Sequence, residues 1–150
     1  MDRITLMYLL LAVVAGALGA IHVPINGSLG VRIGSPLVAT FTFYAVALAV
    51  IGGVCLVRAE RGAFAALVHV PRWYFIAGVI SVVVVGASTF LIPRLGALNV
   101  FAVTVTMQLL VRTVISHFGW LDSPVQPIST ERMLGALLLL AGAFLVVRSG

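Results

Sequence analysis

Five continuous apolar stretches dominate the sequence. They cover approximately residues 4–23, 36–57, 73–92, 97–118 and 132–147. A helix needs about 20 residues to cross a hydrocarbon core of ~30 Å, so each stretch is close to the length of a membrane span. Strands of a membrane barrel would alternate between apolar and polar positions over about ten residues, which these stretches do not. The pattern predicts an all-α integral membrane protein with five transmembrane helices in a single domain, residues 1–150.

The end of the first stretch is less sharply defined than the others. His22, Pro24, Asn26 and Gly27 follow its apolar part before any charged residue appears. Either the helix ends near Val23 and an interfacial loop follows, or it bends at Pro24 and continues toward residue 29. Proline in a membrane helix frees a backbone carbonyl and often lies beside a cavity. Both interpretations are compatible with the residues.

Composition supports a membrane environment. The 150 residues are 62% hydrophobic and 9% charged, whereas a soluble domain carries about 25% charged residues. The formal charge is +5, but all nine basic residues are arginines that stand singly between apolar stretches. This distribution is typical of helix-end anchors and excludes the basic patch of a nucleic-acid partner.

The arginines give only a weak orientation signal. Five crossings put the termini on opposite sides of the membrane, and the positive-inside rule favours a cytoplasmic N-terminus. The N-terminal side carries only two more arginines than the other side, however. This small excess is compatible with a single, weakly favoured orientation or with insertion in both orientations. The N-terminal side carries Arg3, Arg58, Arg61, Arg72 and Arg132, and the other side carries Arg32, Arg94 and Arg148.

Five helices hardly enclose a polar site. Carriers typically build such a site near the membrane midplane, between two inverted repeats. A chain of this size can meet the requirement as half of an inverted-repeat ten-helix transporter. We therefore expect it to pair with an inverted copy of itself, as an antiparallel homodimer, or with a homologous five-helix subunit.

The fourth stretch carries the most informative polar residues. At about 100° per residue, one stripe of this helix contains Thr104, Gln108, Arg112 and Ser116. An arginine at the centre of a bilayer costs at least about 2.5 kcal/mol, so it usually faces protein or water. Arg112 is also only ~9 Å of helix rise from the end of the stretch, so it could instead extend to the interface. Gln108 lies a turn deeper, which favours a hydrogen bond to protein or to substrate.

Several kinds of chemistry have no support in the sequence. No Asp or Glu lies inside any of the five stretches, although exporters of organic cations usually use a membrane carboxylate. There is no nucleophile–base pair, no phosphate-binding loop and no clustered metal-ligand spacing, and Cys55 is the single cysteine. We therefore expect no enzymatic activity, no metal and no cofactor.

Several short motifs lie in order along essentially the whole chain. They are Ala15-Gly16-Ala17-Leu18, Pro24-Ile25-Asn26-Gly27-Ser28-Leu29-Gly30, Gly34-Ser35-Pro36-Leu37, Pro93-Arg94-Leu95-Gly96, Gln108-Leu109-Leu110, His117-Phe118-Gly119, Gly135 and Leu138-Leu139-Leu140-Ala141-Gly142. In their order and spacing these motifs resemble the five-helix YdcZ-like family of the drug/metabolite transporter superfamily.

The resemblance implies a multi-pass protein of the bacterial inner membrane, related to half of a ten-helix carrier. It also suggests that Asn26 and Gln108 are polar residues characteristic of the family. Two positions depart from the family pattern, which usually has a small residue at Met107 and often an Asp at Ser116. Here the charged group is Arg112, one turn earlier. Replacing an acid with a base favours an anionic or neutral ligand.

Three functions remain open. The first is transport of a small polar or anionic metabolite by alternating access in an antiparallel dimer. Its substrate-binding candidates are Asn26, Thr104, Gln108, Arg112 and Ser116. The second is translocation of a lipid or a lipid-linked sugar, and the third is a non-transporting accessory role in a membrane complex. Membrane lipid is a partner in all three.

Overall fold

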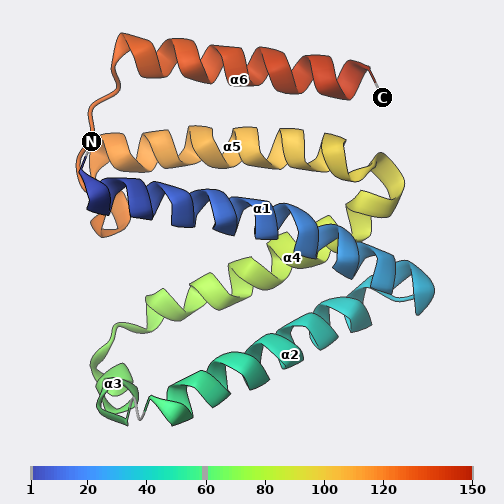
Figure 1. The fold of residues 1–150 in the computed structure, drawn as a ribbon, viewed down its shortest axis with the longest axis vertical. Helices are drawn as coiled ribbons and strands as arrows, with labels where there is room; N and C mark the ends of the chain where they lie inside the picture. Colours follow the sequence, from blue (N-terminus) through green and yellow to red (C-terminus); the bar gives the residue numbers. More distant parts are fainter. Residues whose placement is uncertain (1, 59–60, 150) are drawn as a thin grey trace. The chain divides into compact units, whose positions relative to one another are not determined.

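The computed structural model describes residues 2–58 and 61–149, and this part of the chain contains helices and no strands. Figure 1 shows the elements in chain order. They are α1 (Arg3–Arg32), α2 (Pro36–Val57), α3 (Arg61–Ala66), η1 (Leu67–His69), η2 (Arg72–Phe75), α4 (Ile76–Leu95), α5 (Ala97–Phe118), η3 (Trp120–Asp122) and α6 (Thr130–Arg148).

Five helical segments of the described chain are long and apolar enough to cross a membrane. They are α1, α2, η2 together with α4, α5, and α6. This confirms the predicted all-α membrane fold. The short helical turns between residues 61 and 75 were not predicted, because segments of three to six residues carry no detectable periodicity.

The helix ends follow from local chemistry. Ser35 accepts a hydrogen bond from the backbone N–H of Val38 at 3.2 Å, and Pro36 occupies the first turn of α2, where no N–H is needed. Ser129 caps α6 in the same way. Gly96 separates α4 from α5 at a φ of 80°, a left-handed conformation that glycine adopts without strain.

Helix α1 continues through Pro24 and ends at Arg32. The second of the two interpretations of this region, a helix that continues past the proline, is therefore the one observed. Its 30 residues give a length of about 45 Å, longer than the hydrocarbon core. Proline has no backbone N–H, so the carbonyl of Ala20 lacks its usual donor one turn later.

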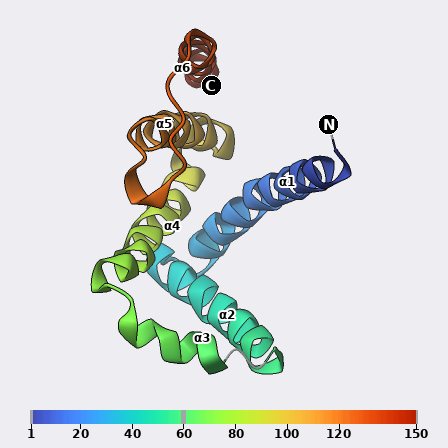
Figure 2. The same cartoon turned by 90° about the vertical axis from the view of Figure 1, so that its left-hand side faces the viewer.

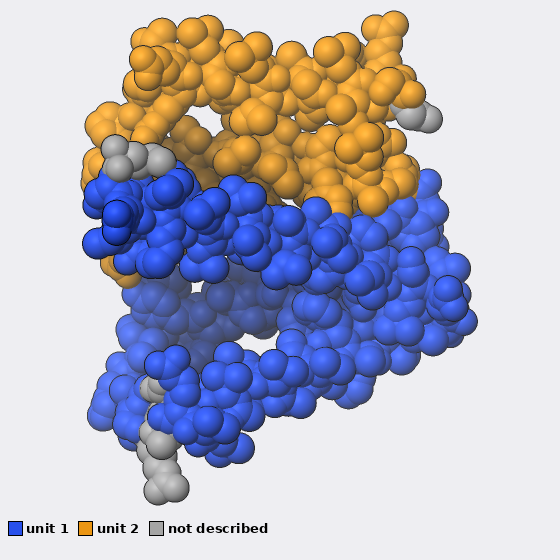
Figure 3. All heavy atoms as spheres, in the orientation of Figure 1, with its two compact units in different colours: residues 1–94 blue, residues 95–150 orange. Residues whose placement is uncertain are grey.

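The chain forms two compact units, residues 1–94 and residues 95–150, which Figure 3 distinguishes by colour. The single domain expected from the sequence stays a prediction.

In the first unit, α1 and α2 form a V whose closed end is the turn at residues 33–35 (Figures 1 and 2). The C-terminal half of α4 packs into this closed end. Gly30 marks the closest approach, because a Cβ atom there would lie 3.3 Å from both Pro36 Cα and Thr89 Cγ2. Ala39 and Ile92 are buried in the same region.

The second unit is an antiparallel hairpin of α5 and α6 (Figure 1). Gly119 ends α5 in a left-handed conformation, with a φ of 66°. A Cβ atom at this position would lie 2.7 Å from Val125 Cγ2, so both the backbone conformation and the space require glycine. The turn brings the following loop back over the end of α5.

Candidate functional site

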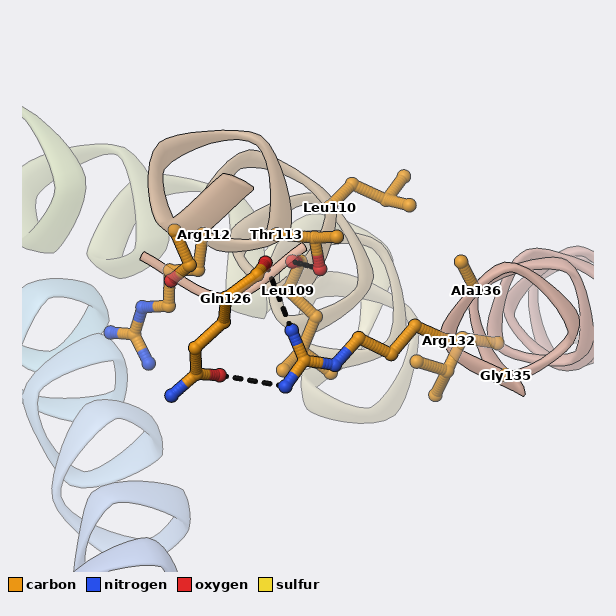
Figure 4. Close-up of a pocket in the computed structure, with 10 residues that line it drawn as sticks. Leu109, Leu110, Arg112, Thr113, Gln126, Arg132, Gly135 and Ala136 are labelled. Carbon is orange, nitrogen blue, oxygen red and sulfur yellow. Dashed lines mark hydrogen bonds between the residues drawn. The ribbon is translucent and has the colours of Figure 1, made fainter. Parts of the chain in front are cut away.

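A pocket with both polar and apolar lining residues lies between the C-terminal half of α5 and the beginning of α6 (Figure 4). Its volume is about 350 Å³. The residues that line it are Leu109, Leu110, Arg112, Thr113, Ser116, Gln126, Arg132, Gly135, Ala136 and Leu139.

The loop between α5 and α6 forms one wall of this pocket. The backbone N–H of Gln126 donates to the carbonyl of Ser116 at 2.8 Å, and the N–H of Ile128 donates to His117 Nδ1 at 3.2 Å. Arg132 completes the connection, since its Nη2 donates to Gln126 Oε1 at 2.7 Å and its Nη1 to the carbonyl of Gln126 at 3.2 Å (Figure 4). The Gln126 side chain is thereby held in the pocket wall.

The pocket is electropositive. Two guanidinium groups, those of Arg112 and Arg132, line it, and no carboxylate does. Arg112 is exposed and has no hydrogen-bond or ion-pair partner within residues 95–149. Thr113 donates its hydroxyl proton to the carbonyl of Leu109 at 2.8 Å, so its oxygen is oriented by its own helix. An anionic group is the ligand that such a lining favours.

The structure separates the candidates on the fourth membrane helix. Arg112 and Ser116 both line the α5–α6 pocket, whereas Gln108 is exposed and does not. Gln108 lies about 140° around the helix from Thr113, which faces the pocket. Thr104 donates to the carbonyl of Val100 at 2.8 Å, so its hydroxyl is bound to its own helix.

Asn26 belongs to the first unit and is almost completely buried, with 5% of its surface exposed. Its Nδ2 donates to Thr89 Oγ1 at 2.7 Å, and Thr89 in turn donates to the carbonyl of Val85 at 2.8 Å. Asn26 also borders a groove of about 330 Å³ between α1 and α2, beside His22, whose ring stacks on Phe43 at 5.4 Å. Asn26 therefore connects α1 to α4 and also contributes to a groove wall.

Three polar residues of the α5–α6 pocket were not among the sequence candidates. Thr113 lies outside the polar stripe that was singled out on its helix, Gln126 lies in a proline-rich loop, and Arg132 was counted only as an orientation signal. One signal could have identified Arg132. A short connection makes consecutive membrane helices antiparallel neighbours, which places the start of α6 beside the end of α5.

A comparison with family models identifies one that covers the chain from residue 7 to residue 145. Its description is "Putative inner membrane exporter, YdcZ". The matched range includes residues of all five membrane-spanning helices. No curated protein and no solved structure matches the chain. Because the family model covers almost the whole sequence, the chain belongs to the YdcZ family. It is a multi-pass protein of the inner membrane with a role in membrane transport.

Proposed function

We propose that this chain transports a small polar or anionic metabolite by alternating access, as half of an antiparallel dimer. The observation that carries the proposal is Arg112, a cation on a membrane helix. It lines a pocket without acidic residues and has no partner in its own unit. The candidate substrate contacts are Asn26, Thr104, Gln108, Arg112 and Ser116.

The environment of Arg112 favours an anionic or neutral solute over a cation. A guanidinium group in a membrane span requires water, a counter-charge or an acceptor. None of the five membrane-spanning stretches expected from the sequence contains an Asp or Glu, so a bound cation would find no carboxylate there. Gln108, exposed one turn deeper, adds an amide that can donate to or accept from a solute.

Pairing is supported by how little of the chain is internally packed. Among the described residues, the buried apolar side chains are Ala39, Ile92 and Val100. An exposed Gln108 on a membrane helix is also costly against lipid, and a second subunit would supply a polar or water-filled neighbour. Two inverted five-helix halves would give the architecture that carriers generally use.

The proposal can be tested with the purified protein in liposomes. The liposomes are loaded with a defined mixture of small carboxylates, sugar phosphates, amino acids and organic cations, and mass spectrometry measures which solutes leave. We expect release of anionic or neutral members of the mixture. Arg112→Gln should reduce this release by about tenfold or more, because a charge-assisted bond is lost, and Arg112→Lys should retain part of it.

Arg148→Gln is the matched control, since Arg148 is the last residue of α6 and does not line the pocket. It should leave release unchanged. Unchanged release in Arg112→Gln would remove Arg112 from the site, and release of cations alone would contradict the substrate class. Release of nothing, with labelled phospholipid also stationary, would favour the accessory role. Movement of the phospholipid alone would favour lipid translocation.

A further inference from the structure

We propose that the pocket between α5 and α6 is a binding site for an oxyanion, a phosphate or carboxylate group held by Arg132 and Arg112 together. Neither Arg132 nor Gln126 belongs to the substrate contacts proposed above. The proposal concerns only the binding of an anion at one end of the α5–α6 hairpin, and it does not depend on whether the chain transports anything.

Arg132 is held in position before any ligand arrives. Its Nη1 donates to the carbonyls of Gln126 at 3.2 Å and Pro127 at 3.4 Å, and its Nη2 donates to Gln126 Oε1 at 2.7 Å. A guanidinium carries five N–H donors, so the Nε–H and one Nη2–H have no partner within residues 95–149. A fixed guanidinium with free donors loses little side-chain entropy when it binds an anion.

The charge of the pocket is uncompensated. Arg112 and Arg132 are both cations that line the pocket, and neither forms an ion pair within residues 95–149. The acids nearest in sequence to the pocket residues, Asp122 and Glu131, do not line it. An anion bound by both arginines would gain two charge-assisted attractions, and the Ser116 hydroxyl and the Gln126 amide would add neutral donors.

The position of the pocket along the membrane normal and its volume both fit an anion of the size of a lipid headgroup. Arg132 is the third residue of α6, and Arg112 lies about 9 Å of helix rise before the end of α5, so the pocket opens near the membrane surface. Its volume of about 350 Å³ lies at the lower end of the range for small-molecule sites. Leu109, Leu110 and Leu139 contribute apolar surface to its lining. A free solute and the phosphate of an anionic lipid can both supply this chemistry.

Two binding measurements on the full chain distinguish these sources. In detergent, inorganic phosphate is titrated while the melting temperature and the heat of binding are followed. In parallel, native mass spectrometry records whether phosphatidylglycerol remains bound in preference to phosphatidylethanolamine. We expect at least one of the two probes to bind. Arg132→Gln and Arg112→Gln should each lower the affinity for that probe by about tenfold or more, because each removes a charged donor.

Matched variants separate binding from folding. Arg132→Lys keeps the positive charge and should retain part of the affinity. Arg148→Gln also removes one positive charge from α6, but at its other end, and should bind the probe as tightly as the original chain does. If Arg132→Gln does not fold, Arg112→Gln decides the outcome, because Arg112 makes no bond within residues 95–149 that folding could lose.

Each result has a definite meaning. Phosphate binding that depends on both arginines identifies a solute site, and lipid retention that depends on both identifies a headgroup site. Binding of neither probe, or binding that is equal in all the variants, overturns the proposal. Because no transport is measured, a failure here leaves the transport proposal standing, and a failure of transport leaves the anion site standing.

Discussion

At the scale of single residues, the most consequential contact in the first unit is the buried hydrogen bond from Asn26 to Thr89, at 2.7 Å. The two residues are 63 positions apart, and Thr89 has no exposed surface. The hydroxyl of Thr89 also donates to the carbonyl of Val85, so one oxygen connects its own helix to α1. In an apolar surrounding such a bond has no water to compete with it.

Thr89→Val should therefore destabilise the protein. Valine has nearly the same shape but cannot accept a hydrogen bond, so the buried amide of Asn26 would lose its partner. We expect a loss of about 1–3 kcal/mol in the free energy of unfolding, measured by denaturant titration in detergent. The matched control is Thr42→Val, whose exposed hydroxyl bonds only to its own helix at Val38 and should cost less than about 0.5 kcal/mol. Equal losses in the two variants would contradict the structural role of the bond.

Hydrogen bonds between side chains of different helices were the hardest feature to predict from the sequence. The family resemblance singled out Asn26, but nothing in the local sequence reveals a partner on another helix. Ser88 and Thr89 each donate to the backbone of their own helix, at Val84 and Val85, as hydroxyls in membrane helices commonly do. The second bond of Thr89 depends on how α1 and α4 meet.

At the scale of helices, small residues do not all have the same use. Gly30 is where α1, α2 and α4 converge, whereas a Cβ atom at Gly16 would meet nothing within 4 Å. Both glycines lie on α1, so they provide a direct comparison of crowded and open positions. Gly16 therefore makes no close helix contact inside the described chain.

Gly30→Ala and Gly16→Ala should consequently have opposite effects. Alanine is better than glycine in a helix by roughly 0.5–1 kcal/mol, so Gly16→Ala should be neutral or slightly stabilising. At Gly30 the added methyl group meets a backbone atom of Pro36, and overpacking of this kind costs about 1–3 kcal/mol. Unfolding of the detergent-solubilised monomer measures both. A Gly30→Ala variant as stable as Gly16→Ala would show that the helices are not in close contact there.

Helix positions were the most predictable part of the fold. The second and fourth spans begin at Pro36 and Ala97 and end at Val57 and Phe118, which are the bounds of the apolar stretches. Ser35, Gly96 and Gly119 stand at three of these ends, and the charged Arg58 follows the fourth. The end of α1 could not be decided from sequence. Proline disfavours a continuous helix, and packing of Gly27 and Gly30 against the neighbouring helices favours it. Only the tertiary contacts show which effect prevails.

At the scale of the whole molecule, orientation in the membrane is the property that the charges barely specify. The positive-inside bias is two arginines, and five spans place the termini on opposite sides. An antiparallel homodimer needs both orientations in comparable amounts. The five spans themselves were predictable, because bilayer thickness sets their length, whereas the pocket depends on residues that face each other across a hairpin.

Dual orientation has a direct test. A cysteine is appended at either terminus in a Cys55→Ser background, and intact spheroplasts are treated with a membrane-impermeant maleimide. We expect each terminus to be labelled to a comparable extent, with permeabilised cells defining full labelling. Protection of one terminus would exclude the antiparallel homodimer. Pairing with a homologous subunit of fixed, opposite orientation would then be the remaining form of the dimer.

The proline inside α1 has a mechanical consequence. Residues 26–30 are clamped by α2 and α4 through the Asn26–Thr89 bond and the contacts of Gly27 and Gly30. Residues 3–23 diverge from α2 along the open arm of the V (Figure 2). Bending at the turn between them breaks one hydrogen bond fewer than bending elsewhere, because Pro24 has already removed it. α1 thus has a short fixed end and a free arm about 30 Å long. A bend of about 10° at this turn would move the tip of the arm by about 5 Å.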